Sequence, residues 1–163
     1  MILNEATIKE ITTRMERYPS RKSAILPALT AAYRQVGHLD PSIYREISRI
    51  IKIPYVEIAE AASFYTMFPK QQVGRYLIQV CHNISCSLRG ADNMLVYLQK
   101  KLGIGMGETT PDNLFTLISV ECLGGCSAAP MMQINQTYYE DLTRSKIDKI
   151  LDDLRAEAEK DGR

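Results

Sequence analysis

The stretch CHNISCSLRGADN (residues 81–93) and the stretch VECLGGCSAAP (residues 120–130) hold all four cysteines of the chain. Each stretch overlaps the end of a run rich in β-branched and aromatic residues, RYLIQVC (75–81) and LFTLISVEC (114–122), which is typical of a strand. A helical pattern over residues 86–102 separates the two runs, and a crossover of this length favours parallel strands. Because loops at the carboxyl ends of parallel strands build sites in α/β proteins, the four sulfurs are expected at one rim of a sheet.

The rest of the C-terminal part extends this pattern. One face of the predicted crossover helix carries Leu88, Ala91, Leu95, Leu98 and Leu102, and Gly103 is expected to end it. MMQINQTYY, residues 131–139, predicts a hairpin that turns at Asn135 and Gln136. A last helix is expected from about Thr143, with Ile147, Ile150, Leu151 and Leu154 buried. The predicted order over residues 73–163 is β-α-β-β-β-α.

In residues 1–72 the apolar residues recur at helical spacing. This pattern predicts an N-terminal helical bundle of four short amphipathic helices. The first helix would bury the face that carries Ile8, Ile11, Met15 and Tyr18, and it would stop at Pro19. The third would bury Ile43, Ile47, Ile50 and Ile51. The residues expected at helix ends are Ser23 and Gly37 for the second helix, Asp40 and Pro41 for the third, and Pro54 for the fourth.

The composition places the chain among soluble globular proteins. It has 163 residues, 45% of them hydrophobic and 24% charged. The net charge of +1 gives no reason to expect a nucleic acid or an anionic membrane as partner. No apolar run approaches about 18 residues, so direct membrane insertion is not expected. The first residues lack the pattern of an export signal, which predicts a cytoplasmic, reducing compartment.

The cysteines are spaced C-x4-C and C-x3-C. A reducing compartment and a chain large enough for its own core disfavour disulfides. Thiol oxidoreductases usually rely on C-x-x-C, a spacing that neither pair has. Structural zinc accepts four such thiolates, and so does an iron–sulfur cluster, so thiolate chemistry alone leaves both open. The glycines beside the cysteines favour backbone amides around the sulfurs and thus modestly favour the cluster. A Rieske site needs two histidines among its ligands. His82 would have only His38 as its partner, and His38 lies in the helical part of the chain, so a Rieske site is not expected.

Several motifs resemble one family, the 24 kDa-type [2Fe-2S] subunit (E subunit) of respiratory complex I, the NADH:quinone oxidoreductase. They are YPSRKSAILPAL, YRQVGHLDP and SFYTMF in the helical part, then CHNISCSLRGAD, GETTPDN and VECLGGCSAAPMMQINQTYYEDLT. The resemblance covers nearly the whole chain. One departure is Asn113 after Asp112, where the family often has glycine; Asn tolerates positive φ, so the turn is expected to survive.

The resemblance implies a two-part α+β chain: a helical bundle over residues 1–72 and a thioredoxin-like ferredoxin domain (α/β) over 73–163. It implies one [2Fe-2S] cluster per chain, with Cys81, Cys86, Cys122 and Cys126 as both its metal ligands and its cofactor-binding residues. No catalytic residue is implied. The cluster would exchange electrons with flavin in a partner flavoprotein subunit, which alone would bind NAD and FMN, so the isolated chain is not expected to oxidise NADH. Further complex subunits would be partners too.

The same resemblance implies a peripheral place on the cytoplasmic side of the inner membrane when the chain is assembled in complex I. The same family also supplies small subunits of soluble NAD-linked hydrogenases and formate dehydrogenases, and this alternative stays open. So does a structural zinc module with four cysteine ligands, and so does a thioredoxin-like thiol oxidoreductase.

Four smaller features complete the expectations. GIGMGE, residues 103–108, follows a helix and lacks the third glycine of a dinucleotide loop, so it is expected to be a linker. SFYTMF, residues 63–68, is expected to be core or a partner anchor. Met131 and Met132 are expected to be strand core and cover for the cluster. The Ala129–Pro130 bond is expected to be cis.

Overall fold

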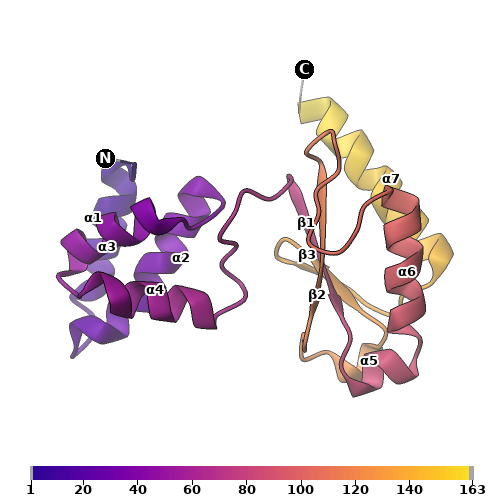
Figure 1. Ribbon diagram of the computed structural model, residues 1–163, viewed down its shortest axis with the longest axis horizontal. Helices are drawn as coiled ribbons and strands as arrows, with labels where there is room; N and C mark the ends of the chain where they lie inside the picture. The colour runs from indigo at the N-terminus through magenta and orange to yellow at the C-terminus, as the bar shows by residue number, and fades with distance from the viewer. Residues whose placement is uncertain (1, 162–163) are drawn as a thin grey trace. The chain divides into compact units, whose positions relative to one another are not determined.

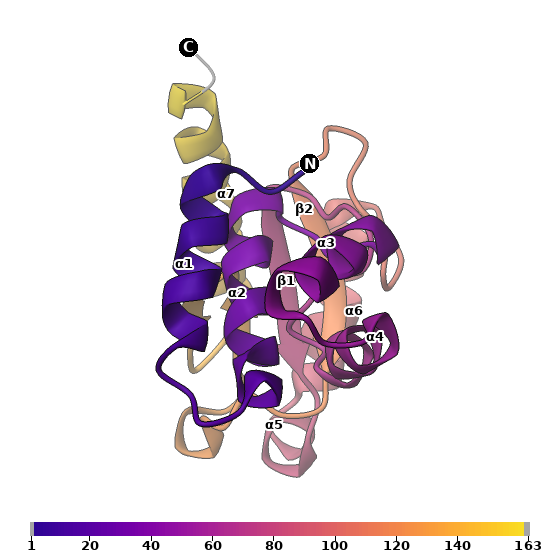
Figure 2. The same ribbon diagram turned by 90° about the vertical axis from the view of Figure 1, so that its left-hand side faces the viewer.

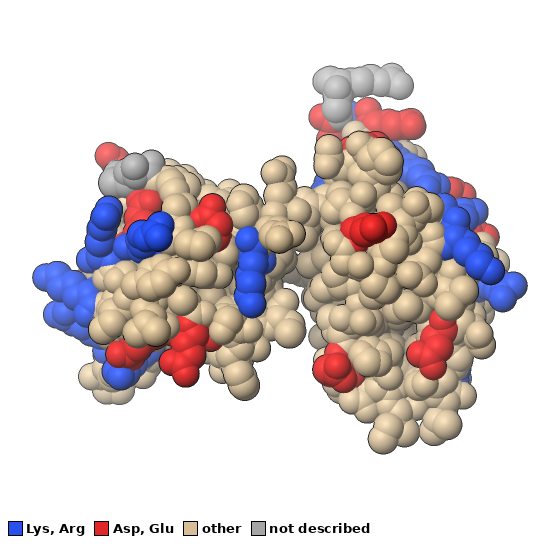
Figure 3. All heavy atoms as spheres, in the orientation of Figure 1, with Lys and Arg blue, Asp and Glu red and all other residues tan. Residues whose placement is uncertain are grey.

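A computed structural model describes residues 2–161. It divides the chain into two compact units, Met1–Gln72 and Val73–Arg163 (Figure 1). Both acidic and basic side chains appear on each unit in the face that Figure 3 shows, in keeping with 20 Lys and Arg against 19 Asp and Glu. None of the helices within residues 2–161 has the length and apolar character needed to cross a membrane.

The described part of the first unit, residues 2–72, contains four α-helices and one short 3₁₀ helix. They are α1 (Glu5–Met15), η1 (Arg21–Ala24), α2 (Ile25–Val36), α3 (Pro41–Ile51) and α4 (Tyr55–Phe64). Figure 2 shows α1 and α2 side by side. One apolar core joins the helices, with Leu29, Leu39, Ile47, Ile51 and Ile58 all fully buried. Burial of this shared core is what holds such short helices, which are marginal in water by themselves.

The predicted C-terminal cap of the second helix and the predicted N-terminal cap of the third helix are confirmed. Oδ1 of Asp40 accepts hydrogen bonds from the backbone amides of Ser42 at 2.7 Å and Ile43 at 3.2 Å, and Pro41 occupies the first helical position. Gly37 ends α2 with φ of 77°, a conformation that favours glycine. Pro54 precedes α4, as predicted.

Two predicted boundaries in this unit are wrong. α1 ends at Met15, so Tyr18 lies beyond the helix and is 41% exposed. α2 begins at Ile25, because the 3₁₀ helix η1, capped by Ser20, takes the place of the first turn predicted from Ser23. Both differences arise in the segment around Pro19, where no apolar period marks the boundary.

The second unit is built on a four-stranded sheet with the order β2-β1-β3-β4. The strands are β1 (Tyr76–Cys81), β2 (Phe115–Val120), β3 (Met132–Ile134) and β4 (Thr137–Tyr139). β1 pairs with β2 in parallel, as predicted, and with β3 in the antiparallel sense. β3 and β4 form the predicted hairpin, and Asn135 turns it with φ of 53°. Asn113 also adopts positive φ, 56°, so the turn survives without glycine.

Three α-helices accompany this sheet within residues 73–161: α5 (Ile84–Leu88), α6 (Ala91–Leu102) and α7 (Arg144–Asp161). Figure 1 shows α6 and α7 on the same side of the sheet. Leu98 of α6 and Ile147 and Leu151 of α7 are fully buried in the sheet core, as predicted. The second unit therefore has mixed helix and sheet content, with α6 and α7 on one side of its sheet.

The predicted single crossover helix is wrong, because the chain breaks it at Arg89 and Gly90. Gly90 adopts φ of 89° and starts a separate helix, α6. Leu88, predicted on the buried face, belongs to the short helix α5 and is 83% exposed.

Replacing Asp40 by Ala is expected to lower the free energy of unfolding of the first unit by about 1 kcal/mol, because two amides of α3 lose their acceptor. Asp40→Asn should cost much less, since Asn caps helices about as well as Asp. Urea unfolding followed by circular dichroism measures both variants. Equal losses would show that the carboxylate charge, and not the cap, stabilises α3.

The same variant has an expected pH dependence. The Ser42 hydroxyl, helped by the amides of Ile43 and Ser42, lowers the pKa of Asp40 below its ordinary value of 3.8. A carboxyl with a lowered folded pKa stabilises the fold above its unfolded pKa, and that stabilisation is lost as pH falls through the folded pKa. The stability difference between wild type and Asp40→Ala should therefore be constant near neutral pH and shrink below about pH 4.

Candidate iron–sulfur site

The ends of β1 and β2 bring the two cysteine-bearing loops to one rim of the sheet. Cys81 is the last residue of β1, and its partner in the parallel register is Val120, the last residue of β2. Cys122 follows two residues later in the loop and not at the end of the strand, where the sequence had placed it. The predicted meeting of the two strand ends is confirmed.

The four thiols have unequal exposure. Cys81 and Cys86 are buried, with 3% and 2% of their surface exposed. Cys86 lies on α5, which Asn83 caps by accepting a hydrogen bond from the amide of Ile84. Cys122 and Cys126 are exposed. One pair of sulfurs therefore lies inside the domain and the other at its surface.

A small buried cluster surrounds the inner pair. Cys81 and Cys86 pack with Ala91, Ala129 and Met131, and Leu123 lies against them. Met131 is 1% exposed, which confirms its predicted place as cover beside the cysteines, and Met132 is buried in the sheet core.

Gly125 in the second cysteine loop lies very close to Met131. A Cβ atom on Gly125 would lie 2.5 Å from Sδ of Met131, so a larger residue there would require the end of this methionine side chain to shift. Glycine at this position lets the loop lie directly against Met131.

Backbone hydrogen bonds fasten the second cysteine loop. The amide of Cys81 donates to the carbonyl of Met131 at 3.2 Å. The amides of Asp141 and Leu142 donate to the carbonyls of Ala128 and Pro130. The Ala129–Pro130 peptide bond is cis, as predicted. The loop that ends in Pro130 is thus tied both to β1 and to the segment before α7.

The environment of the inner pair favours negative charge on the sulfur of Cys81 and disfavours it on the sulfur of Cys86. Burial raises the pKa of the Cys81 thiol, but the amides of Asn83 and Leu123, together with the thiols of Cys86 and Cys122, outweigh it and lower the pKa. Burial and the neighbouring Cys81 raise the pKa of Cys86, although the amide of Met131 opposes them. The amide of Gly124 donates to Sγ of Cys122 at 3.3 Å. Backbone amides therefore lower the pKa of Cys81 and oppose the rise in that of Cys86, and the amide of Gly124 is hydrogen-bonded to Cys122.

His82 and Glu121 are the residues next to Cys81 and Cys122 in the sequence. His82 is partly exposed, and its Nε2 lies 3.6 Å from Oε1 of Glu121. His38, the second histidine that a Rieske site would require, belongs to the first unit.

The residues present fit a two-iron cluster. No three His, Cys, Asp or Glu side chains within residues 2–161 are grouped so as to hold one metal ion. The thiol of Cys81 interacts directly with the thiols of Cys86 and Cys122, and Cys126 acts on Cys86 through its charge. A [2Fe-2S] cluster takes four thiolates shared between two irons, and amide donors near its sulfurs are expected.

Two further sequence motifs lie away from the cysteines. Gly103–Glu108 is a loop after α6, in which the Glu108 carboxylate accepts a hydrogen bond from the amide of Gly105 at 2.6 Å, so the predicted linker is confirmed. In SFYTMF, only Phe68 is core, 2% exposed and edge-on to Tyr33. The exposed fractions of the remaining large side chains are 77% for Phe64, 38% for Tyr65 and 55% for Met67.

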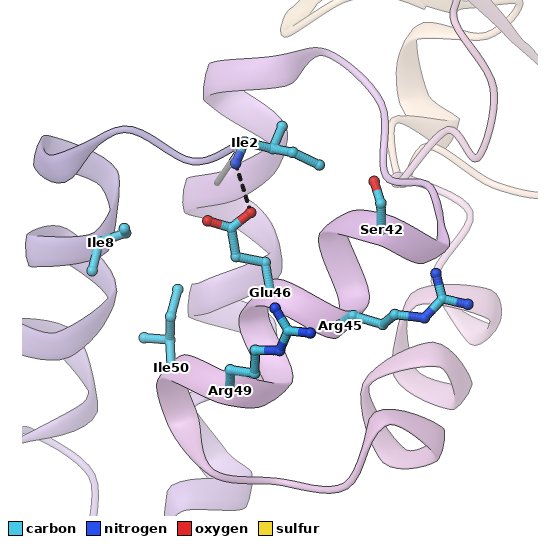
Figure 4. A pocket seen from close by; sticks show the side chains of 7 residues that line it. All are labelled: Ile2, Ile8, Ser42, Arg45, Glu46, Arg49 and Ile50. Carbon is cyan, nitrogen blue, oxygen red and sulfur yellow. Dashed lines mark hydrogen bonds between the residues drawn. The ribbon is translucent and has the colours of Figure 1, made fainter.

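An open pocket of about 520 Å³ lies in the first unit and contains none of the cysteines (Figure 4). The Glu46 carboxylate of α3 points into it and accepts hydrogen bonds from the amides of Ile2 at 2.8 Å and Leu3 at 3.3 Å. Arg45 and Arg49 lie on the same helix. The carboxylate in this pocket therefore fastens the N-terminal segment to α3.

Comparisons with known proteins agree with the geometry of the site. The family model described as thioredoxin-like [2Fe-2S] ferredoxin matches residues 11–155. The chain is 43% identical over 148 residues to an NADH-quinone oxidoreductase E subunit, the one numbered 2, of Rhizobium meliloti (strain 1021), covering 91% of this chain and 88% of that one. It is 47% identical over 143 residues to the NADH-quinone oxidoreductase E subunit of Rickettsia conorii (strain ATCC VR-613 / Malish 7), covering 86% of each chain.

A solved structure is similar as well. A chain in the crystal structure of NAD+-reducing [NiFe]-hydrogenase in the air-oxidized state matches with a TM-score of 0.71 and 27% identity over 82% of this chain. The match spans 23% of that longer hydrogenase chain.

Alkylation of the reduced, metal-free chain should modify Cys122 and Cys126 before Cys81 and Cys86, because only the first two thiols are exposed. The buried thiols should react at least about tenfold more slowly, since local opening that costs above about 1.4 kcal/mol must come first. Mass spectrometry of peptides after timed quenching measures the four rates. Early reaction of Cys81 would show that its lowered pKa outweighs its burial.

Proposed function

The chain belongs to the thioredoxin-like [2Fe-2S] ferredoxin family, and on that premise we propose that it is the E-type electron-transfer subunit of an NADH:quinone oxidoreductase. The observation that supports this proposal most is the convergence of two strand-end loops that carry all four cysteines at one rim of the sheet. Electron transfer needs no acid, base or nucleophile from the chain.

We assign the four ligands of the cluster to Cys81, Cys86, Cys122 and Cys126. The [2Fe-2S] cluster supplies one-electron exchange when it is bound. Its reduction potential depends on hydrogen bonds to sulfur and on solvent exposure. The chain's own contribution is ligation, burial and orientation. The amides of Asn83, Leu123 and Met131 stabilise thiolate charge at the buried pair. Met131 excludes water from one side of this pair.

We further propose a partner subunit and a location for this chain. A flavoprotein subunit that binds NADH and FMN would exchange electrons with this chain, and the assembled complex would hold it peripherally on the cytoplasmic side of the inner membrane. Residues 1–72 would act as an N-terminal helical bundle and residues 73–163 as the ferredoxin domain. The relatives named as complex I subunits support assembly with partner subunits.

A second candidate is the equivalent small subunit of a soluble NAD-linked hydrogenase or formate dehydrogenase. The similarity to the NAD+-reducing hydrogenase favours it at 27% identity. The NADH-quinone oxidoreductase subunits reach 43% and 47% identity along most of their own length, which favours complex I. The neighbouring genes distinguish the two candidates. Genes for further quinone oxidoreductase subunits would favour complex I, and genes for a hydrogenase or formate dehydrogenase would favour the second candidate.

Anaerobic purification of the chain is expected to yield about two irons and two acid-labile sulfides per chain. One-electron reduction should then produce an EPR signal. One zinc ion, no sulfide and no EPR signal would instead establish the structural zinc module. A metal-free chain with a disulfide that cycles between oxidised and reduced forms would establish the thiol oxidoreductase.

Cys86→Ala should lose nearly all bound iron, because the chain has no spare cysteine to replace this ligand. Ser85→Ala is the matched control on the same helix α5 and should keep wild-type iron and sulfide content. Iron and sulfide analysis, with circular dichroism to confirm folding, measures both. Full iron content in a folded Cys86→Ala variant would contradict the ligand assignment.

A further inference from the structure

The inner pair of thiols is closed to solvent, so iron and sulfide can reach it only if a covering element moves. Cys81 and Cys86 are almost fully buried, and the side chains packed around them include Met131, which is also buried. Two parts of the chain cover this pair and carry cysteines themselves, the helix α5 and the segment from Cys122 to Met131. The part that is held by fewer contacts should open first.

The helix α5 is the more weakly held of the two. It has five residues, Cys86 is its one buried residue, and it lies at one end of the second unit (Figure 1). Every backbone–backbone hydrogen bond that the described structure gives residues 83–90 goes to a residue within 83–94. Gly90, with φ of 89°, separates α5 from α6, so α5 can move while α6 stays in place. A helix this short is marginal by itself in water.

The segment from Cys122 to Met131 is fastened to distant parts of the chain. The amides of Asp141 and Leu142 donate to the carbonyls of Ala128 and Pro130 at 2.8 Å and 2.9 Å. The carbonyl of Met131 accepts a hydrogen bond from the amide of Cys81 at 3.2 Å. These three backbone hydrogen bonds must break before residues 128–131 can leave the inner pair. The described backbone hydrogen bonds of α5 are all local, so its opening breaks none of this kind.

One ion pair joins α5 to the residue that fastens this segment. Arg89, at the C-terminal end of α5, places Nη2 4.0 Å from Oδ1 of Asp141. Both side chains are more than half exposed, so the pair holds α5 weakly and can separate readily. Arg89 is also the only Lys, Arg, Asp or Glu between His82 and Gly90. Asp141 is thus connected to both covering elements, through its carboxylate to α5 and through its amide to Ala128.

We propose that α5 is the gate through which iron and sulfide reach the inner thiols, and that the Arg89–Asp141 ion pair holds this gate closed. The inference rests on the proposed function. When the pair separates, α5 moves about Gly90 and carries Cys86 away from Cys81, which opens both thiols. Each thiol loses its proton to water as it binds iron. Ligation then holds α5 in place, because Cys86 is its one buried residue. Arg89 and Asp141 are positioning residues that act through Cys86.

The test uses the full chain, both metal-free and loaded anaerobically from ferric iron and sulfide. The variants are Arg89→Ala, Arg89→Lys, which keeps the charge, and Asp141→Asn, which removes a charge with a residue that tolerates the φ of 46° found there. Lys100→Ala is the control, because it removes an exposed positive charge from α6 in the same unit. The alkylation rate of Cys86 in the metal-free chain, the rate of iron loss to a chelator and the urea midpoint are measured for each.

Arg89→Ala and Asp141→Asn should each speed alkylation of Cys86 and loss of iron by about two- to fivefold, the range expected for an exposed ion pair. Arg89→Lys and Lys100→Ala should stay near wild type. Because the two residues act as one pair, the double variant Arg89→Ala with Asp141→Asn should be no faster than either single variant. Fully additive effects, wild-type rates in Arg89→Ala, or a fall in the urea midpoint that accounts for the whole acceleration would overturn the role of the ion pair.

Hydrogen exchange in the metal-free wild type tests which covering element opens. After correction for intrinsic rates, the amides of Ser87 and Arg89 in the α5 segment should exchange at least about tenfold faster than those of Asp141 and Leu142. Equal or slower exchange at Ser87 and Arg89 would overturn the gate and leave the proposed function intact. A wild-type chain that takes up no iron and sulfide would overturn the proposed function and the gate together.

Discussion

The parallel pairing of β1 and β2 is the constraint on which the candidate site depends. Because the register sets Cys81 opposite Val120, both strands end at the same rim, and the loops that follow them carry the four cysteines. A shift of one residue would move every side chain of one strand to the other face. The buried face formed by Ile78 and Leu117, both fully buried, fixes the register and thereby the position of the thiols.

The four thiols differ in burial, and this difference suits a site that exchanges electrons. The inner pair, Cys81 and Cys86, lies among apolar side chains where burial penalises thiolate charge, and backbone amides outweigh that penalty at Cys81 but not at Cys86. The outer pair meets solvent in a run without charged residues. A site of this kind protects its cofactor on one side and leaves the other side open to a partner.

Local signals in the sequence predicted many of the elements. Asp40 with Pro41, Gly37, and the turns at Asn113 and Asn135 have chemistry that only a few backbone conformations accept, and the structure places each as predicted. The break at Gly90 was missed because the apolar period continues through it from Leu88 to Leu102. Glycine within a helical pattern is often tolerated, so the sequence could not show that this one ends a helix.

The sequence by itself determined which residue types are available to the site: four thiols in two pairs, with glycines and amides beside them and hardly any charge. It also determined the β-α-β order that makes the strand ends coincide. Only the tertiary structure decided which thiols are buried, since Cys81 and Cys86 have the same local chemistry as Cys122 and Cys126. Burial depends on which side chains from distant parts of the chain, such as Met131, pack over each sulfur, and no local pattern encodes that contact.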